Sequence, residues 1–232
     1  MLGLALSNST RPGRRAVNPI PDLDPFMWLD ASSVSGFEEE DPVDTVPDLS
    51  GNGNDGNQPT LMQMPWYIPN AFGGRPGLLF DGVDDWIPVP ITSGVAQYFA
   101  VIKSSTATWN GYWGIMEAAN LAETHDVNAR WGLMSQGTTQ FHNDPPPDGV
   151  RKNGVDLSSP FDCGTITSPM ILSVKTRLGG VASEPRGIFQ LQQVFFGHGL
   201  LAELVAFNTI QSPENTADIE AYLARKYGIT LS

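Results

Sequence analysis

The chain has 232 residues, a formal net charge of −12 and 41% hydrophobic residues. That hydrophobic share can build a core and excludes global disorder. The acidic balance excludes general binding to nucleic acid, because phosphates must be neutralised by cations. A count of 24 glycines and 19 prolines, spread along the chain, favours many short strands joined by many turns, in a single domain.

The N-terminal residues differ from the rest in charge. Ten acidic residues and no lysine or arginine lie between residues 16 and 74, whereas the preceding stretch carries three arginines and no acid: Arg11, Arg14 and Arg15. A basic arm before an acidic body favours docking between copies, because opposite charges on neighbouring subunits can pair; a frayed, solvated terminus is the alternative. We therefore expect an extended arm, residues 1–25, a globular domain, residues 26–232, and a homo-oligomer.

The first apolar residues come before the arginines, which is the reverse of a secretory signal, and no later stretch is long enough to span a membrane. We expect a chain that is made in a host cytoplasm and does not insert into a membrane. The single cysteine, Cys163, excludes an internal disulfide framework, and we interpret it as a small buried hydrophobe rather than a reactive thiol.

The first half of the chain predicts strands separated by polar turns. Phe26–Asp30 is the first strand, and Ser50–Asn57 is a tightly curled loop, since Gly and Asn tolerate positive φ. Residues 75–90 have two β-like runs around Asp81-Gly82, which we interpret as a hairpin. Pro88 places the second run at an edge or bulge, because proline cannot donate to a ladder.

The second half continues this pattern and ends in a helix. Tyr98–Ile102 is apolar throughout, as in a strand at the middle of a sandwich, and Asn153-Gly154 predicts a tight hairpin. Further strands are expected at Gly111–Met116, Ala129–Met134, Met170–Val174, Phe189–Phe196 and Leu200–Phe207. Ser212 as N-cap, Pro213 at the first position and Gly228 past the last turn bound one amphipathic helix that would cover an open side of the sandwich. The predicted fold is an all-β antiparallel sandwich with one short C-terminal helix and an extended N-terminal arm.

Several spaced motifs follow one another in an order that resembles a known family: Trp28-Leu29-Asp30, Asp48–Asp55, Gly74-Arg75-Pro76, Phe80–Asp85, Ala202–Asn208 and Ile219–Leu223. Over residues 26 to 229 the chain resembles the concanavalin A-like lectin/glucanase superfamily, in its laminin-G-like jelly-roll branch. The resemblance implies a jelly-roll sandwich. It also implies a place among bacteriophage virion proteins or large bacterial surface proteins, but no single activity, because the fold hosts sugar-binding, adhesive, enzymatic and structural members.

Catalysis is not favoured by the sequence. Glycanases of this superfamily carry acids at alternate positions of one strand, so that two carboxylates share a face. Glu203 is a lone acid in its strand, and Glu38–Asp41 are consecutive and alternate between faces. We therefore expect no catalytic residues.

Two binding sites remain as hypotheses. Calcium takes oxygen ligands, which Asp48, Asn52, Asn54 and Asp55 could supply; the alternative is that these side chains hydrogen-bond their own backbone. The turn residues Asp81, Asp84 and Asp85 offer further oxygens.

A sugar needs an exposed aromatic ring beside polar groups. The best local candidate is Trp109, Asn110, Tyr112 and Trp113, while Trp28, Trp66, Trp86 and Trp131 are interpreted as core.

These features favour a non-enzymatic structural protein of a bacteriophage particle: a head decoration, fibre or tail-associated protein. Its basic arm would join it to other virion proteins, and lysis would release it without an export signal. The alternative is a carbohydrate-binding module that attaches to a host surface glycan. A glycan-cleaving enzyme is the third class.

Overall fold

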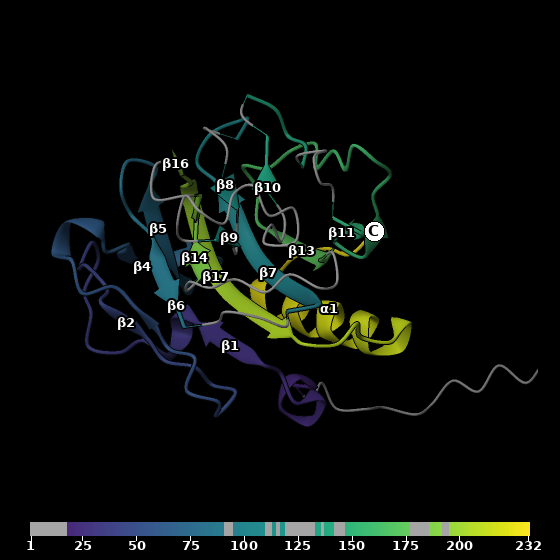
Figure 1. The fold of residues 1–232 in the computed structure, drawn as a ribbon, viewed down its shortest axis with the longest axis horizontal. Helices are drawn as coiled ribbons and strands as arrows, with labels where there is room; N and C mark the ends of the chain where they lie inside the picture. Colours follow the sequence, from purple (N-terminus) through teal and green to yellow (C-terminus); the bar gives the residue numbers. More distant parts are fainter. Residues whose placement is uncertain are drawn as a thin grey trace, which may run out of the picture.

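The computed structural model of the chain describes residues 18–90, 95–109, 113–114, 117–118, 133–135, 137–141, 147–176, 186–191 and 195–232. Its main element is one antiparallel sheet of eight strands (Figure 1). Seven of these strands follow one another in the order β12-β11-β13-β7-β17-β5-β4, and β1 pairs with β17 beside them. Their bounds are β1 Met27–Asp30, β4 Trp66–Phe72, β5 Arg75–Asp81, β7 Gln97–Ser104, β11 Gly149–Lys152, β12 Val155–Asp156, β13 Met170–Lys175 and β17 His198–Phe207.

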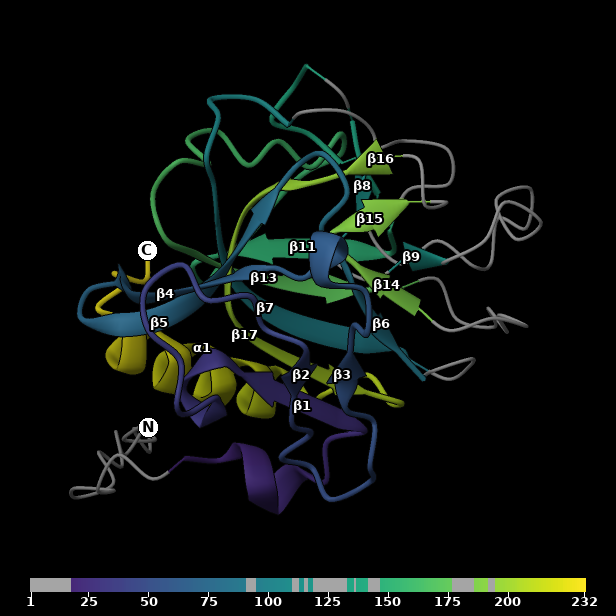
Figure 2. The same cartoon turned by 90° about the vertical axis from the view of Figure 1, so that its left-hand side faces the viewer.

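Shorter strands form the opposing layer (Figure 2). A four-stranded sheet has the order β10-β8-β15-β16, a three-stranded sheet the order β6-β14-β9, and β2 pairs with β3. Their bounds are β2 Thr45–Val46, β3 Gly56–Asn57, β6 Ile87–Val89, β8 Trp113–Gly114, β9 Glu117–Ala118, β10 Leu133–Met134, β14 Arg186–Ile188, β15 Gln190–Leu191 and β16 Phe195–Phe196. Among the residues that the structure describes, the second layer therefore consists of several small sheets.

The α-helix α1, Pro213–Tyr227, begins and ends as the sequence predicts. The Ser212 side chain accepts a hydrogen bond from the backbone N–H of Asn215, Pro213 occupies the first turn, and Gly228 adopts φ 66°. Short 3-10 helices cover Ile20–Leu23 (η1), Ala31–Ser33 (η2) and Leu61–Gln63 (η3). Across the part of the chain that the structure describes, no helix combines the length and hydropathy that a membrane span requires.

Both faces of the large sheet are buried at its centre. Along β7, Tyr98, Ala100 and Ile102 point into the core between the layers, while Phe99 and Val101 point into a second core beneath α1. Ile219 and Leu223 of α1 complete this second core. Figure 1 shows α1 lying against the large sheet. Burial on both sides explains the uninterrupted apolar run that predicted a central strand. The helix covers the outer face of the large sheet, so the fold is an all-β sandwich with one extra layer.

The hairpin expected over residues 75–90 is wrong. β5 pairs with β4 and β17 in the large sheet, whereas β6 pairs with β14 in the opposing layer. The turn at Asp81–Asp85 therefore carries the chain from one layer to the other. Pro88 does lie in an edge strand, because β6 is the outer strand of its sheet.

The hairpin at Asn153-Gly154 is confirmed: β11 pairs with β12, and the two turn residues adopt φ 49° and 87°. Part of the predicted arm, residues 1–25, packs against the domain. Residues 1–17 lie outside the described residues, while Ile20 in η1 is fully buried in the core beneath α1. The packed part of the chain thus extends N-terminally of Phe26 at least as far as Ile20.

Candidate functional site

The predicted aromatic site begins with a residue that is inside the protein. Trp109 is 1% exposed and belongs to the core between the layers. Its backbone N–H donates a hydrogen bond of 2.7 Å to the carbonyl of Thr138, which holds this segment in place. Trp109 therefore offers no exposed ring to a sugar, contrary to our expectation. Asn110 and Tyr112 lie outside the described residues, and only the backbone of Trp113 is described, in β8, so their part of the site stays a prediction.

The loop proposed for calcium is tied to the backbone. Asp48 Oδ1 accepts hydrogen bonds from the N–H of Trp28 and of Ser50, and Oδ2 accepts from the Ser50 hydroxyl and the N–H of Asn54. Asp55 accepts from the N–H of Asp48 at 2.7 Å. These contacts are those of the alternative in which the loop stabilises itself.

The two asparagines of this loop also face the backbone. The side-chain amides of Asn52 and Asn54 donate to the carbonyl of Phe26, at 3.2 and 2.8 Å. Together with Asp48, they hold the loop against the start of β1. The calcium site stays a prediction, and any bound ion would have to compete with these hydrogen bonds.

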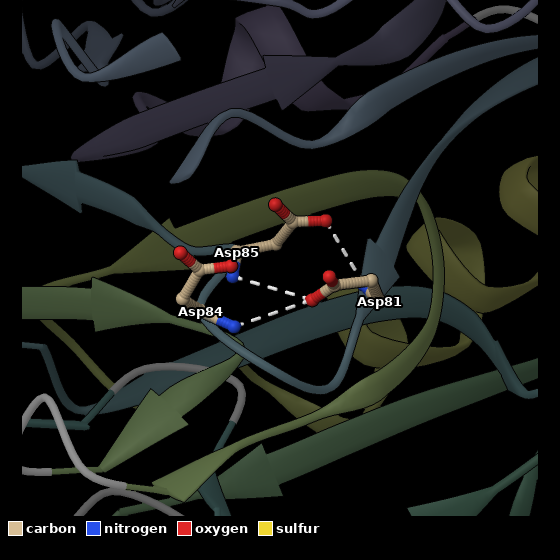
Figure 3. Close-up of side chains that lie close together, drawn as sticks. All are labelled: Asp81, Asp84 and Asp85. Atoms are coloured by element: carbon tan, nitrogen blue, oxygen red, sulfur yellow. Dashed lines mark hydrogen bonds between the residues drawn. The ribbon is translucent and has the colours of Figure 1, made fainter. Parts of the chain in front are cut away.

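A second group of carboxylates lies in the turn between the layers. Oxygens of Asp81, Asp84 and Asp85 lie within 4.8 Å of one another (Figure 3). Asp81 Oδ1 accepts from the N–H groups of Asp84 and Asp85, and Asp85 Oδ2 accepts from the N–H of Asp81 at 2.9 Å. Burial, reinforced by the charges of Asp81 and Asp84, raises the pKa of Asp85 to about 7. The group is thus engaged in shaping its own turn.

Glu203 is buried beneath the helix. Leu201 pairs with Ile102 and Glu203 with Val101, so a β-bulge at Ala202 breaks the register of β17 there. Glu203 Oε1 accepts from the Trp28 indole at 2.7 Å, and Oε2 accepts from the Tyr227 hydroxyl at 2.9 Å. An acid that is 1% exposed cannot meet a polymeric substrate, so Glu203 acts in the structure of the core.

A pocket of about 250 Å³ lies at the edge of the large sheet where β11, β12 and β13 meet. The register builds it, since directly opposed residues share a face: Lys175 faces Gly149, and Arg151 faces both Ser173 and Asp156. Because Gly149 has no side chain, space remains beside the Lys175 stem. The lining is Asp148, Gly149, Val150, Arg151, Asp156, Leu157, Phe161, Ser173 and Lys175.

One wall of this pocket is rigid. The Nε atom of Arg151 lies 2.9 Å from Glu220 Oε1 on α1, and its Nη1 lies 2.9 Å from Asp156 Oδ2. The hydrogen bond to Glu220 is the main reason why the pKa of Arg151 is raised. With its donors engaged, Arg151 forms part of the pocket wall. The polar side chains left to meet a ligand are those of Asp148 and Lys175, because Ser173 is 1% exposed and its hydroxyl accepts from the Gln97 amide at 2.9 Å.

Little in the sequence indicated this pocket. Asn153-Gly154 predicted the hairpin that carries Arg151 and Asp156, but nothing local indicated that β13 would place Lys175 beside it.

The three arginines of the arm, Arg11, Arg14 and Arg15, lie outside the described residues.

No family model and no curated protein matches the chain. Among solved structures, the chain is similar to the sialidase of Trypanosoma rangeli, with 11% identity and a TM-score of 0.48 over 92% of this chain. The same enzyme in complex with the inhibitor DANA gives 10% identity and a TM-score of 0.43 over 86% of this chain. The chain spans about a third of the sialidase, 34% and 33% of its length in the two comparisons. At these values the similarity transfers neither activity nor ligand.

The expected role in a bacteriophage particle is corrected by this comparison. The similar solved structures named here are sialidases, and they include a complex with sialic acid but no virion protein. The basic arm had suggested the virion, but a basic arm is compatible with many other settings. The expectation of a phage structural protein is therefore withdrawn.

Proposed function

We propose that the chain is a carbohydrate-binding module of the concanavalin A-like, laminin-G-like type, and that the pocket between β11, β12 and β13 is its sugar site. The observation that carries the proposal is the mixture of groups around one small concave site. The Lys175 ammonium donates and the Asp148 carboxylate accepts. Sugar hydroxyls need such a mixture, because each is donor and acceptor at once.

The apolar part of the pocket suits the other side of a sugar. Phe161 and Leu157 are half-buried and line the same space. The C–H face of a pyranose can pack on such a surface while its hydroxyls reach the polar groups. The apolar face of the sugar would thus lie on the apolar part of the pocket, and its hydroxyls would lie at the polar part.

The charges of the lining favour a neutral sugar. Asp148 and Asp156 balance Lys175 and Arg151, and Arg151 is also paired with Glu220 behind the wall. No net positive charge remains for a carboxylated sugar. Sialic acid, which is a carboxylated sugar, is therefore disfavoured as the ligand of this pocket.

The proposal is for binding without cleavage. Within the described part of the chain, Glu203 and Asp30 are buried against Lys226, and the oxygens of Asp81 and Asp85 accept backbone N–H groups. Most retaining and inverting glycosidases need a pair of carboxyl groups open to the glycosidic bond. These acids are occupied in holding the fold.

The test is a glycan array followed by calorimetry with the best neutral oligosaccharide. Lys175→Met and Asp148→Asn should each weaken binding about tenfold, which corresponds to losing one good hydrogen bond to a buried ligand. Arg225→Met, which changes an exposed helix residue, is the matched control and should bind as the wild type does. Equal affinity of all four proteins, or a preference for sialylated glycans, would contradict the site. Release of shorter sugars from the bound oligosaccharide would contradict the absence of catalysis.

A further inference from the structure

Large apolar side chains are exposed where η3, the start of β4 and the turn after β5 come together. Leu61, Met62, Trp66 and Val83 are 63%, 75%, 41% and 70% exposed, and we call them the Trp66 patch. The backbone of Trp86 links two segments of this patch. The Trp86 backbone N–H donates to the Gln63 carbonyl at 3.1 Å, which holds η3 against the turn that carries Val83. A concentration of apolar surface of this kind marks an interaction site.

Acidic residues flank the Trp66 patch on two sides. On one side the segment 38–42 runs beside β4: Tyr67 N–H donates to the Asp41 carbonyl at 2.8 Å, and Pro42 bridges to Trp66. Three glutamates of this segment are exposed, Glu38, Glu39 and Glu40. On the other side the turn carries Asp81 and Asp84 next to Val83. The patch is therefore an apolar surface with a negative rim.

The first fifteen residues of the chain have the complementary composition. Met1, Leu2, Leu4 and Leu6 provide apolar side chains, and they are followed by three arginines and no acid. Fully extended, fifteen residues reach about 50 Å. This length is enough to pass from one molecule to the surface of a neighbour.

We propose that residues 1–15 of one copy bind the Trp66 patch of a second copy. The leucines cover the apolar centre and the arginines pair with the acidic rim, chiefly Glu38–Glu40 and Asp84. Both kinds of contact are needed. Exposed ion pairs alone contribute little binding free energy, and apolar contacts alone do not select one orientation of the arm. This association is independent of sugar binding, because it uses neither Asp148 nor Lys175.

The test is sedimentation velocity of the full-length chain over a range of concentrations, at low and at high salt. The wild type should self-associate reversibly, and added salt should weaken the association because the pairs between arm and rim are screened. Arg11→Glu/Arg14→Glu/Arg15→Glu should weaken it at least about tenfold, and so should Leu61→Ser/Met62→Ser. Adding Glu38→Lys/Glu39→Lys/Glu40→Lys to the arginine variant should restore it, because both charge signs are then exchanged.

The matched control is Ile210→Ser, which removes an apolar side chain of 41% exposure outside the patch and should associate as the wild type does. A wild type that stays monomeric at the highest concentration would overturn the proposal, as would an association that the arm and patch variants leave unchanged. Failure of the charge exchange to restore association would also overturn the pairing of arm and rim. Circular dichroism of each variant shows whether it is folded.

Discussion

The ammonium of Lys226 lies 2.7 Å from Oε2 of Glu203, and the two side chains are 9% and 0% exposed. The same ammonium lies 2.5 Å from Asp30 Oδ2. One helix residue thus faces two carboxylates that come from β1 and β17, and the Tyr227 hydroxyl adds a further hydrogen bond to Glu203. Because a buried charge is costly unless it is paired, this cluster fixes where α1 sits on the large sheet.

Lys226→Met should destabilise the protein by about 3–5 kcal/mol, the usual cost of removing one partner of a buried ion pair. The methionine fills a similar volume, but Asp30 and Glu203 are left without their cation. The free energy of unfolding in urea measures the effect. Arg225→Met, on the exposed side of the same helix, should change it little. A loss as small as that of Arg225→Met would mean that the cluster does not anchor the helix.

Asp85→Asn should flatten the dependence of stability on pH between about 4 and 7. Burial raises the pKa of Asp85 from 3.8 to about 7, so the folded protein keeps a proton that the unfolded chain has released. The contribution of Asp85 to the free energy of unfolding is therefore fully present below the unfolded pKa of 3.8, and it is lost as the pH rises to about 7. Asparagine cannot ionise, and its amide oxygen can still accept from the Asp81 N–H.

Unfolding in urea at a series of pH values checks this. The exposed Asp44→Asn is the control and should keep the wild-type slope. If Asp85→Asn and the wild type show the same slope, the carboxyl of Asp85 does not titrate as its burial implies.

The large sheet and the helix could be predicted because their signals are local. Burial on both faces makes Tyr98–Ile102 apolar throughout, and Ser212, Pro213 and Gly228 bound α1 by their own backbone chemistry. In the second layer, strands were expected at Gly111–Met116, Ala129–Met134 and Phe189–Phe196, and β8, β10 and β16 lie within these ranges. The sequence did not indicate how these short strands pair, because their partners are distant in the chain.

The site was harder to predict because it depends on partners that are distant in the sequence. A turn at Asp81-Gly82 predicts a reversal of the chain, but whether the two runs pair depends on β4, β14 and β17. Trp109 and Trp66 have the same side chain, yet one is 1% and the other 41% exposed, so our interpretation of Trp66 as core is wrong. The pocket exists because the register of three strands places Lys175 beside the hairpin of β11 and β12.

Cys163 should resist alkylation in the native protein. It is 3% exposed, and its burial raises the pKa of the thiol to about 12, so almost no thiolate forms near neutral pH. Iodoacetamide followed by mass spectrometry should label it only in denaturant. Ser158→Cys, at an exposed position, should react quickly in the same protein. Comparable labelling of both cysteines in the native state would contradict the interpretation of Cys163 as a buried hydrophobe.

Chelation should leave the thermal midpoint unchanged, because the loop at Asp48 is held without a metal. Its carboxylate already accepts four hydrogen bonds, from the N–H groups of Trp28, Ser50 and Asn54 and from the Ser50 hydroxyl. Asp48→Ala should therefore destabilise the protein, by about 1–3 kcal/mol for the polar groups left without a partner. Thermal unfolding with EDTA, with added calcium and with neither separates the two cases. A midpoint that rises with calcium in the wild type and not in Asp48→Ala would show that the loop holds the ion after all.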